Sequence, residues 1–189
     1  MQSIRSTNKA RARWAVGILL LGTTLAVFVG ASLAADTKAQ DTANDATLKG
    51  LTAIRVAVDV SDAAAEQQSL RKADLQSRIE GKLKKAGLQV LGESERAQGM
   101  PTLYLNLSLL ALDKSADPSA AEVYVYSIDL ALIQEVRLLR APGIKAASPT
   151  WRAPGSLGTL EAAELAGLRD TADELADRFL AAYRAANAK

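Results

Sequence analysis

Residues 103–109, with the sequence LYLNLSL, decide the fold. Leucine occupies every second position, and the side chains between the leucines are polar or aromatic. This period of two is typical of a β-strand with one face in a hydrophobic core. Residues 123–132, VYVYSIDLAL, repeat the alternation after an expected turn at 113–121, and this strand can continue to Leu139 through a bulge. The two stretches predict a sheet with one strongly apolar face.

Towards the N-terminus, the alternation of residues 54–60 predicts the first strand. A helix is expected after it, because Leu75, Ile79 and Leu83 recur at every fourth position and Gly87 is suited to end the helix. The short apolar run that follows Gly87 predicts a second strand. Such a β-α-β unit favours parallel pairing.

Towards the C-terminus, residues 141–149 are expected to form a loop because they contain two prolines and a glycine. Residues 150–152 then predict a short fifth strand at the sheet edge. A last helix, capped by Thr159, is expected to run nearly to the C-terminus. Its apolar stripe consists of Leu168, Ala172, Leu175, Phe179 and Tyr183.

The predicted order of elements is therefore β-α-β-β-β-β-α, which defines the α+β class. The simplest arrangement is a two-layer sandwich, in which a mixed sheet of four or five strands carries both helices on one face. That arrangement buries both apolar stripes and leaves the other face of the sheet uncovered.

The first 35 residues predict export. They contain four basic residues and no acidic one, followed by an uncharged run from Trp14 to Ala35. This pattern predicts a signal peptide over residues 1–35, although the run is also long enough for an uncleaved signal anchor. Residues 36–49 are expected to be a flexible tether, and 50–189 a single α+β domain. The predicted location is periplasmic or otherwise extracytoplasmic, with inner-membrane anchoring as the alternative.

Composition excludes several kinds of chemistry. Of the 23 Lys and Arg residues, four lie in the leader, so 19 remain against 21 Asp and Glu, and no basic footprint for nucleic acid is expected. The chain has no Cys, so neither disulfides nor a lipid-modified N-terminal cysteine are expected. It has no His, so the usual zinc sites and the commonest general base are absent. No cofactor and no metal are predicted.

The uncovered face of the sheet is where binding residues are expected. The polar positions expected there are Arg55, Asp59, Tyr104, Asn106, Ser108, Ser127 and Asp129. They can form cross-strand polar pairs on a solvated sheet, or they can form a docking surface. Trp151 is either a lid of the core or a binding platform. The predicted binding residues are Arg55, Tyr104, Asn106, Asp129 and Trp151.

Other charged and glycine-rich segments have plain structural interpretations. The acidic residues of the last helix, Asp170, Asp173, Glu174 and Asp177, are expected to form a solvated face. The first helix carries Arg71, Arg78, Lys82 and Lys85 along one flank, which can contact anionic lipid or lie in solvent. Residues 155–158, GSLG, are expected to be a turn, with anion binding as a weaker alternative. The S-x-x-K pattern at 69–72 is taken as accidental, because the other motifs of serine acyl enzymes are absent.

The domain resembles a family of short exported bacterial proteins of unknown function. The resemblance rests on GLxxIxV at 50–56, IExKLxKAGL at 79–88, PxLYL at 101–105, YxYSI at 124–128, TW at 150–151 and FxxxYxxxN at 179–187. More distantly, the domain is similar to small α/β envelope modules such as the amino-terminal domain of TolB and the auxiliary lipoproteins of transport systems. The more distant resemblance implies a docking role, and the first carries over no site residue.

We therefore expect a non-enzymatic module that docks another envelope protein or complex through a sheet edge or the open face. One alternative is a carrier of a lipid or small apolar ligand, which requires a Leu- and Val-lined cavity between helices and sheet. Another is a carboxylate-dependent enzyme, which requires converging acidic side chains in a cleft. The expected partners are an envelope protein or lipid, and membrane contact is also possible through an uncleaved leader.

Overall fold

The computed structural model describes residues 44–61, 70–92, 94–95, 97, 99–112 and 121–188. The expected leader and the first part of the expected tether lie outside these residues. The elements are β1 (Ala53–Val60), α3 (Lys72–Lys85), β2 (Gln89–Val90), β3 (Thr102–Ala111), β4 (Val123–Leu138), β5 (Ala141–Glu161), the 3-10 helix η1 (Ala162–Gly167) and α4 (Leu168–Asn187). No helix within the described ranges is both long and apolar enough to cross a bilayer.

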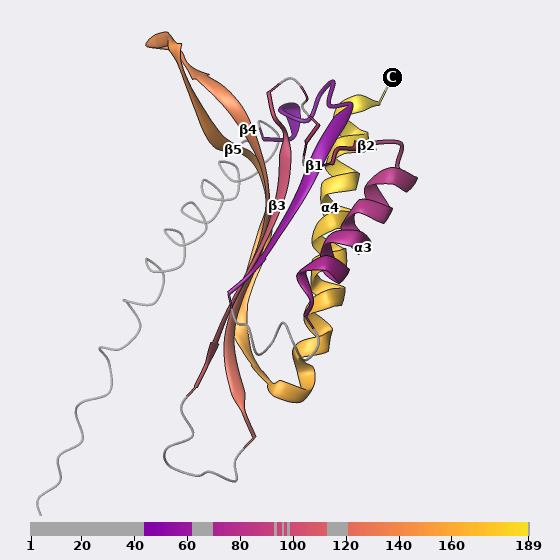
Figure 1. Ribbon diagram of the computed structural model, residues 1–189, viewed down its shortest axis with the longest axis vertical. Coiled ribbons are helices and arrows are strands. Elements are labelled where there is room, and N and C mark those ends of the chain that lie inside the picture. The colour runs from indigo at the N-terminus through magenta and orange to yellow at the C-terminus, as the bar shows by residue number, and fades with distance from the viewer. Residues whose placement is uncertain are drawn as a thin grey trace, which may run out of the picture. The chain divides into compact units, whose positions relative to one another are not determined.

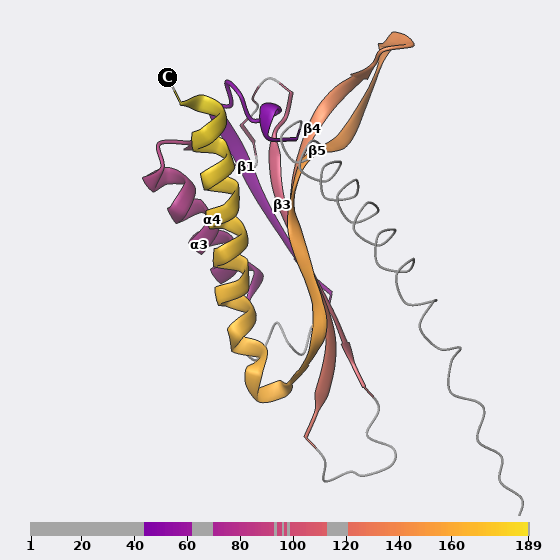
Figure 2. The same cartoon turned by 180° about the vertical axis from the view of Figure 1, so that it is seen from behind.

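The five strands form one mixed sheet in the order β2-β1-β3-β4-β5. Strand β1 pairs in parallel with both β2 and β3, whereas β3–β4 and β4–β5 are antiparallel. Figures 1 and 2 show α3 and α4 side by side on one face of this sheet. The predicted α+β class, the order of elements and the parallel β-α-β unit are confirmed.

The core lies between the sheet and the two helices. Alternate leucines of β3, from Leu103 to Leu107, are fully buried, as the LYLNLSL pattern predicted. Ile79 and Leu83 cover them from α3, and Phe179 covers them from α4; all three side chains are fully buried. All the described buried residues of this cluster are apolar, so the stability of the domain depends on hydrophobic packing.

The predictions of a loop, a short edge strand and a Thr159 helix cap before α4 were wrong. Residues 141–149 are part of a 21-residue strand, β5, rather than a loop before a short edge strand. Thr159 does not cap a helix; η1 begins after Glu161, whose side chain forms a reciprocal capping box with Glu164. Antiparallel pairing with the long strand β4 overrides the local turn preference of the prolines. An edge strand such as β5 tolerates proline.

The GSLG segment is also part of β5 and not a turn. Gly155 lies where β5 shifts register against Ile128 and Leu130 of β4. A Cβ atom at Gly155 would come within 2.5 Å of the Ile128 carbonyl oxygen and 3.1 Å of the Asp129 Cβ atom. The close approach of β4 and β5 therefore requires glycine here. This packing constraint explains Gly155 without an anion-binding turn.

Residues 44–49 pack against the domain, in contrast to the flexible tether expected over 36–49. The Leu48 side chain is completely buried. The side-chain amide of Asn187 donates a hydrogen bond of 2.9 Å to the Leu48 carbonyl, and its amide oxygen accepts one of 2.8 Å from the Gly50 N–H. Thr47 donates to the carbonyl of Thr150 at 3.0 Å. These contacts are long-range, so the local polar composition gave no sign of them.

We predict that Leu48→Ala lowers the free energy of unfolding by about 2–5 kcal/mol, the usual cost of emptying a buried leucine site. Urea unfolding of the full chain, followed by circular dichroism, measures this change. The matched control is Leu139→Ala, because the Leu139 side chain is 99% exposed; we expect a change within about 0.5 kcal/mol. Equal stabilities of the two variants would contradict the packing of residues 44–49.

Candidate functional site on the open face of the sheet

The sheet face that points away from α3 and α4 carries a row of polar side chains, which we call the polar row. Asp59 of β1 pairs with Asn106 of β3, which pairs in turn with Asp129 of β4. The Asn106 side-chain amide donates a hydrogen bond of 3.2 Å to an Asp129 carboxylate oxygen. Lys72 forms an ion pair of 3.0 Å with Asp59 from the start of α3. The polar row therefore carries both signs of charge.

Tyr104 lies next to the polar row, two residues before Asn106 on the same face of β3. Burial raises the pKa of the Tyr104 phenol, and the negative charges of Asp59 and Asp129 raise it further. Both effects disfavour a phenolate at this position. The phenol therefore remains a neutral group, able to donate and accept hydrogen bonds, throughout the physiological pH range.

The same face becomes apolar beyond the polar row, a feature that the sequence analysis missed. Leu110 on β3 is 65% exposed, and Leu157 on β5 is 77% exposed. Strand β4 lies between them. Its Val125 pairs with Leu110, and its Ser127 pairs with Leu157. We call Leu110, Val125 and Leu157, together with Leu112 and Val123, the apolar end of the open face. Two sequence signals pointed to it: Leu110 is a leucine at a position where the alternation expects a polar residue, and Val123 and Val125 alternate onto the face of Ser127 and Asp129.

Arg55 and Trp151 do not join the polar row. A guanidinium nitrogen of Arg55 donates to the carbonyl oxygens of Gly92 at 3.3 Å and Glu95 at 2.8 Å, so this side chain holds the segment after β2. Trp151 is 5% exposed and contacts the Phe179 ring edge-to-face at 5.2 Å. Its indole N–H donates to a carboxylate oxygen of Asp45 at 2.9 Å. Of the five predicted binding residues, the structure thus brings together Tyr104, Asn106 and Asp129.

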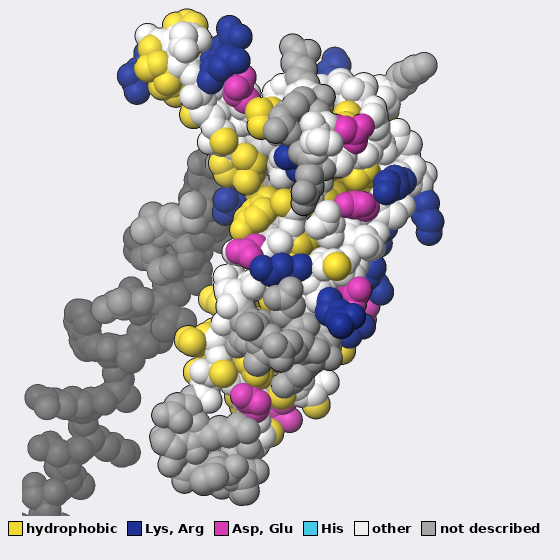
Figure 3. Space-filling model, in the orientation of Figure 1, with side chains coloured by type: hydrophobic (Ala, Val, Ile, Leu, Met, Phe, Trp, Pro, Cys, Tyr) yellow, Lys and Arg dark blue, Asp and Glu magenta, His cyan; other side chains and the backbone are white. Residues whose placement is uncertain are grey.

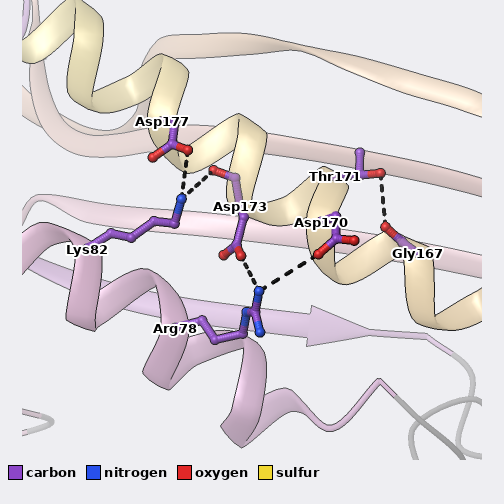
Figure 4. A network of polar contacts seen from close by, with 7 residues as sticks. All are labelled: Arg78, Lys82, Gly167, Asp170, Thr171, Asp173 and Asp177. Carbon is purple, nitrogen blue, oxygen red and sulfur yellow. Dashed lines mark hydrogen bonds and ion pairs between the residues drawn. The ribbon is translucent and has the colours of Figure 1, made fainter.

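The charged flanks of the two helices neutralise each other. Arg78 of α3 forms an ion pair with Asp173 of α4, and Lys82 forms one of 2.7 Å with Asp177 (Figure 4). The hydrogen bond and charge of Asp173 raise the pKa of Arg78. The expectation of a solvated acidic face agrees with the exposed Asp170, Glu174 and Asp177. The sequence left the basic flank of α3 to anionic lipid or solvent, and the pairing of the two flanks was missed because the packing of α3 against α4 is a tertiary contact. Arg78 and Lys82 of the basic flank are thus turned towards carboxylates of the neighbouring helix.

The structure gives little support to the two alternative functions. A surface hollow of about 250 Å³ lies beside Met100, Ile133 and Lys145, and a much smaller one lies beside Arg55; neither is between helices and sheet. Within the described ranges, no group of three Asp or Glu side chains is placed to hold a metal ion. The carboxylates of α4 face α3 and solvent instead of converging in a cleft.

Comparison with known proteins gives only distant likenesses. No protein-family profile and no curated protein sequence matches the chain. Among solved structures, it is similar to rare lipoprotein B from Shewanella oneidensis, with 16% identity over 69% of this chain and 94% of that chain and a TM-score of 0.34. It is also similar to a PelC variant from Paraburkholderia phytofirmans, a dodecamer, with 14% identity over 74% of this chain and 89% of that chain and a TM-score of 0.37. A minor lipoprotein from Acinetobacter baumannii has 10% identity over 72% of this chain and 93% of that chain, with a TM-score of 0.38. These values are too low to carry a conclusion about function.

We predict that the Tyr104 phenol titrates above its ordinary pKa of about 10. Below pH 10 both folded and unfolded chains keep the proton, so Tyr104 adds no pH dependence to stability. Above pH 10 the unfolded chain releases it more readily, so the free energy of unfolding falls until the folded pKa is passed. NMR of chain labelled at the tyrosine Cζ atoms, with Tyr104→Phe to assign the signal, measures this pKa. Titration of Tyr104 at or below pH 10 would contradict the placement beside Asp59 and Asp129.

Proposed function

We propose that this chain is an exported, non-enzymatic module that docks another envelope protein through the open face of its sheet. The observation that carries the proposal is the apolar end, where Leu110 and Leu157 are largely exposed on the face opposite the helices. Exposed leucines that gather on one surface, next to satisfied polar groups, are typical of the apolar centre and polar rim of a protein interface.

The face fits a protein partner better than it fits a lipid surface. Asp59 and Asp129 lie on it, and their carboxylates would be repelled by anionic headgroups. Asn106 and the Lys72–Asp59 pair offer both hydrogen-bond donors and acceptors, which suits the polar rim of a protein interface. The partner surface that we expect is therefore apolar at its centre, with polar groups that complement the polar row.

The open face is also a better docking surface than the β5 edge of the sheet. The sheet has two edges, the two-residue strand β2 and the long strand β5, and β5 contains Pro142, Pro149 and Pro154. Proline has no backbone N–H to donate to an added strand, and prolines on an edge strand are a recognised way to prevent edge-to-edge pairing. Edge and face were both open alternatives from the sequence; the prolines favour the face over the β5 edge.

The partner can be found by site-specific photo-crosslinking in intact cells. A photoreactive residue at Leu157 is expected to give one discrete protein adduct, whereas the same residue at Ala185, exposed on α4 on the opposite side of the sheet, is expected to give none. The adduct identifies the partner by mass spectrometry. Adducts of equal yield at both positions, or no protein adduct at Leu157, would be evidence against docking through the open face.

With the partner purified, we predict that the double variant Leu110→Asp, Leu157→Asp binds at least tenfold more weakly, because a carboxylate at the apolar centre loses its hydration without gaining a partner. Isothermal titration calorimetry measures the affinity. Leu139→Asp is the control, since Leu139 is also an exposed leucine but lies outside the open face, and it should bind normally. Unchanged affinity of the double variant would refute the assignment of the apolar end.

A further inference from the structure

A two-stranded arm projects from the sheet at the end where β4 turns into β5. The last residue of β4 that pairs with β3 is Ile133, which lies opposite Thr102. Beyond it, the Glu135 N–H donates one hydrogen bond of 2.7 Å to the Gly99 carbonyl, and the strand pairing is between β4 and β5, from Gln134 opposite Ser148 to Leu138 opposite Ala141. We call residues 134–148 the arm; it is the orange hairpin that leaves the sheet in Figure 1.

The tip of the arm is apolar and fully accessible. The Leu139 side chain is 99% exposed, the largest value among the exposed large hydrophobic residues of the described chain, and Ile144 is 52% exposed. Figure 3 shows yellow hydrophobic side chains at the end of the arm with dark blue basic side chains beside them. Folding alone does not explain a leucine at this position, because its side chain contributes almost no burial.

The arm has the opposite charge to the rest of the chain that follows the expected leader. It carries Arg137, Arg140 and Lys145 against a single acidic residue, Glu135. Lys145 is paired with Glu135 at 2.8 Å, whereas no carboxylate of the described residues lies within ion-pair distance of Arg137 or Arg140. Residues 36–133 and 149–189 contain 16 basic and 20 acidic residues. The positive charge is thus concentrated on the arm, beside the exposed leucine.

We propose that the tip of the arm docks onto an anionic lipid surface, with Leu139 inserted among the headgroups and Arg137 and Arg140 contacting phosphate. An apolar side chain of this kind gains from entering the interfacial layer, and neighbouring cations gain from the negative surface potential. Arginine suits this position because its guanidinium binds phosphate with two donors while its stem stays in apolar surroundings.

A lipid surface fits the arm better than a protein groove does. The exposed leucine stands at the end of a narrow hairpin, so a protein would need a deep acidic recess to cover it, whereas a headgroup layer accommodates a projecting tip without a matching shape. This site is separate from the open face, whose carboxylates disfavour lipid. The proposal therefore does not depend on the proposed function.

The absence of cysteine allows a direct test in the full chain. Pro142→Cys, an exposed position near the tip, is labelled with an environment-sensitive fluorophore; Ala163→Cys, beyond the opposite end of β4, is the matched control. Labelled protein is mixed with vesicles of phosphatidylcholine alone or of phosphatidylcholine mixed with the anionic lipid phosphatidylglycerol. The apolar run from Trp14 to Ala35 can tether the chain to either vesicle, so the label at the tip is the readout, rather than sedimentation.

We expect the Pro142→Cys label to shift its emission to the blue with anionic vesicles and not with neutral ones, and the Ala163→Cys label to shift with neither. High salt should reverse the shift, because it screens the arginines. In Arg137→Gln or Arg140→Gln, the ratio of docked to undocked tip, read from fluorescence lifetimes, should fall about fivefold for each cation removed. Leu139→Asn should abolish the shift.

Three results would overturn the proposal. The first is an unchanged emission of the tip label on anionic vesicles, the second an equal shift on neutral vesicles, and the third an equal shift of the Ala163→Cys label. A shift that appears only when the crosslinked protein partner is added would instead assign the arm to a protein interface. Because Leu139→Asp is expected to leave affinity for the partner of the open face unchanged, failure of one proposal does not affect the other.

Discussion

The burial of two helical stripes on one face of a single sheet is the constraint on which the rest of the structure depends. The alternate leucines of β3 can be removed from water only if α3 and α4 lie side by side over them. That arrangement brings Arg78 and Lys82 opposite Asp173 and Asp177, so oppositely charged flanks meet where the helices touch. It also leaves the second face of the sheet without a helical cover.

Periodicity predicts whatever is decided by neighbours in sequence. The alternation in β1, β3 and β4 and the four-residue spacing of Leu75, Ile79 and Leu83 gave the class, the order and the covered face correctly. The length of β5 could not be predicted in this way, because its pairing with β4 is a tertiary contact that overrides the turn preference of its prolines and glycines. Leu48 is a similar case, since Asn187 and Thr150, which hold its segment, are far away in sequence.

In the candidate site, too, sequence predicts what neighbouring residues decide and misses what tertiary contacts decide. Alternation placed Tyr104, Asn106 and Asp129 on one face, and the register between β3 and β4 made Asn106 and Asp129 direct partners. Arg55 alternates in the same way, but its long side chain reaches the carbonyls after β2 and holds that segment. The apolar end was missed because Leu157 lies in the part of β5 that was taken for a turn. A face assignment from sequence is therefore only as complete as the strand boundaries.

The arm follows from a difference in length between the two layers. The 20 residues of α4 extend about 30 Å at the rise of an α-helix, whereas the 16 residues of β4 extend about 50 Å at the rise of a strand. A helical layer of this length cannot cover the whole of β4, and β3 ends its pairing with β4 at Ile133. Beyond the hydrogen bond from Glu135 to Gly99, the β4–β5 ribbon has neither a helix nor a third strand beside it in the described part of the chain. An apolar side chain at its tip, such as Leu139, therefore gains burial only from something outside the domain.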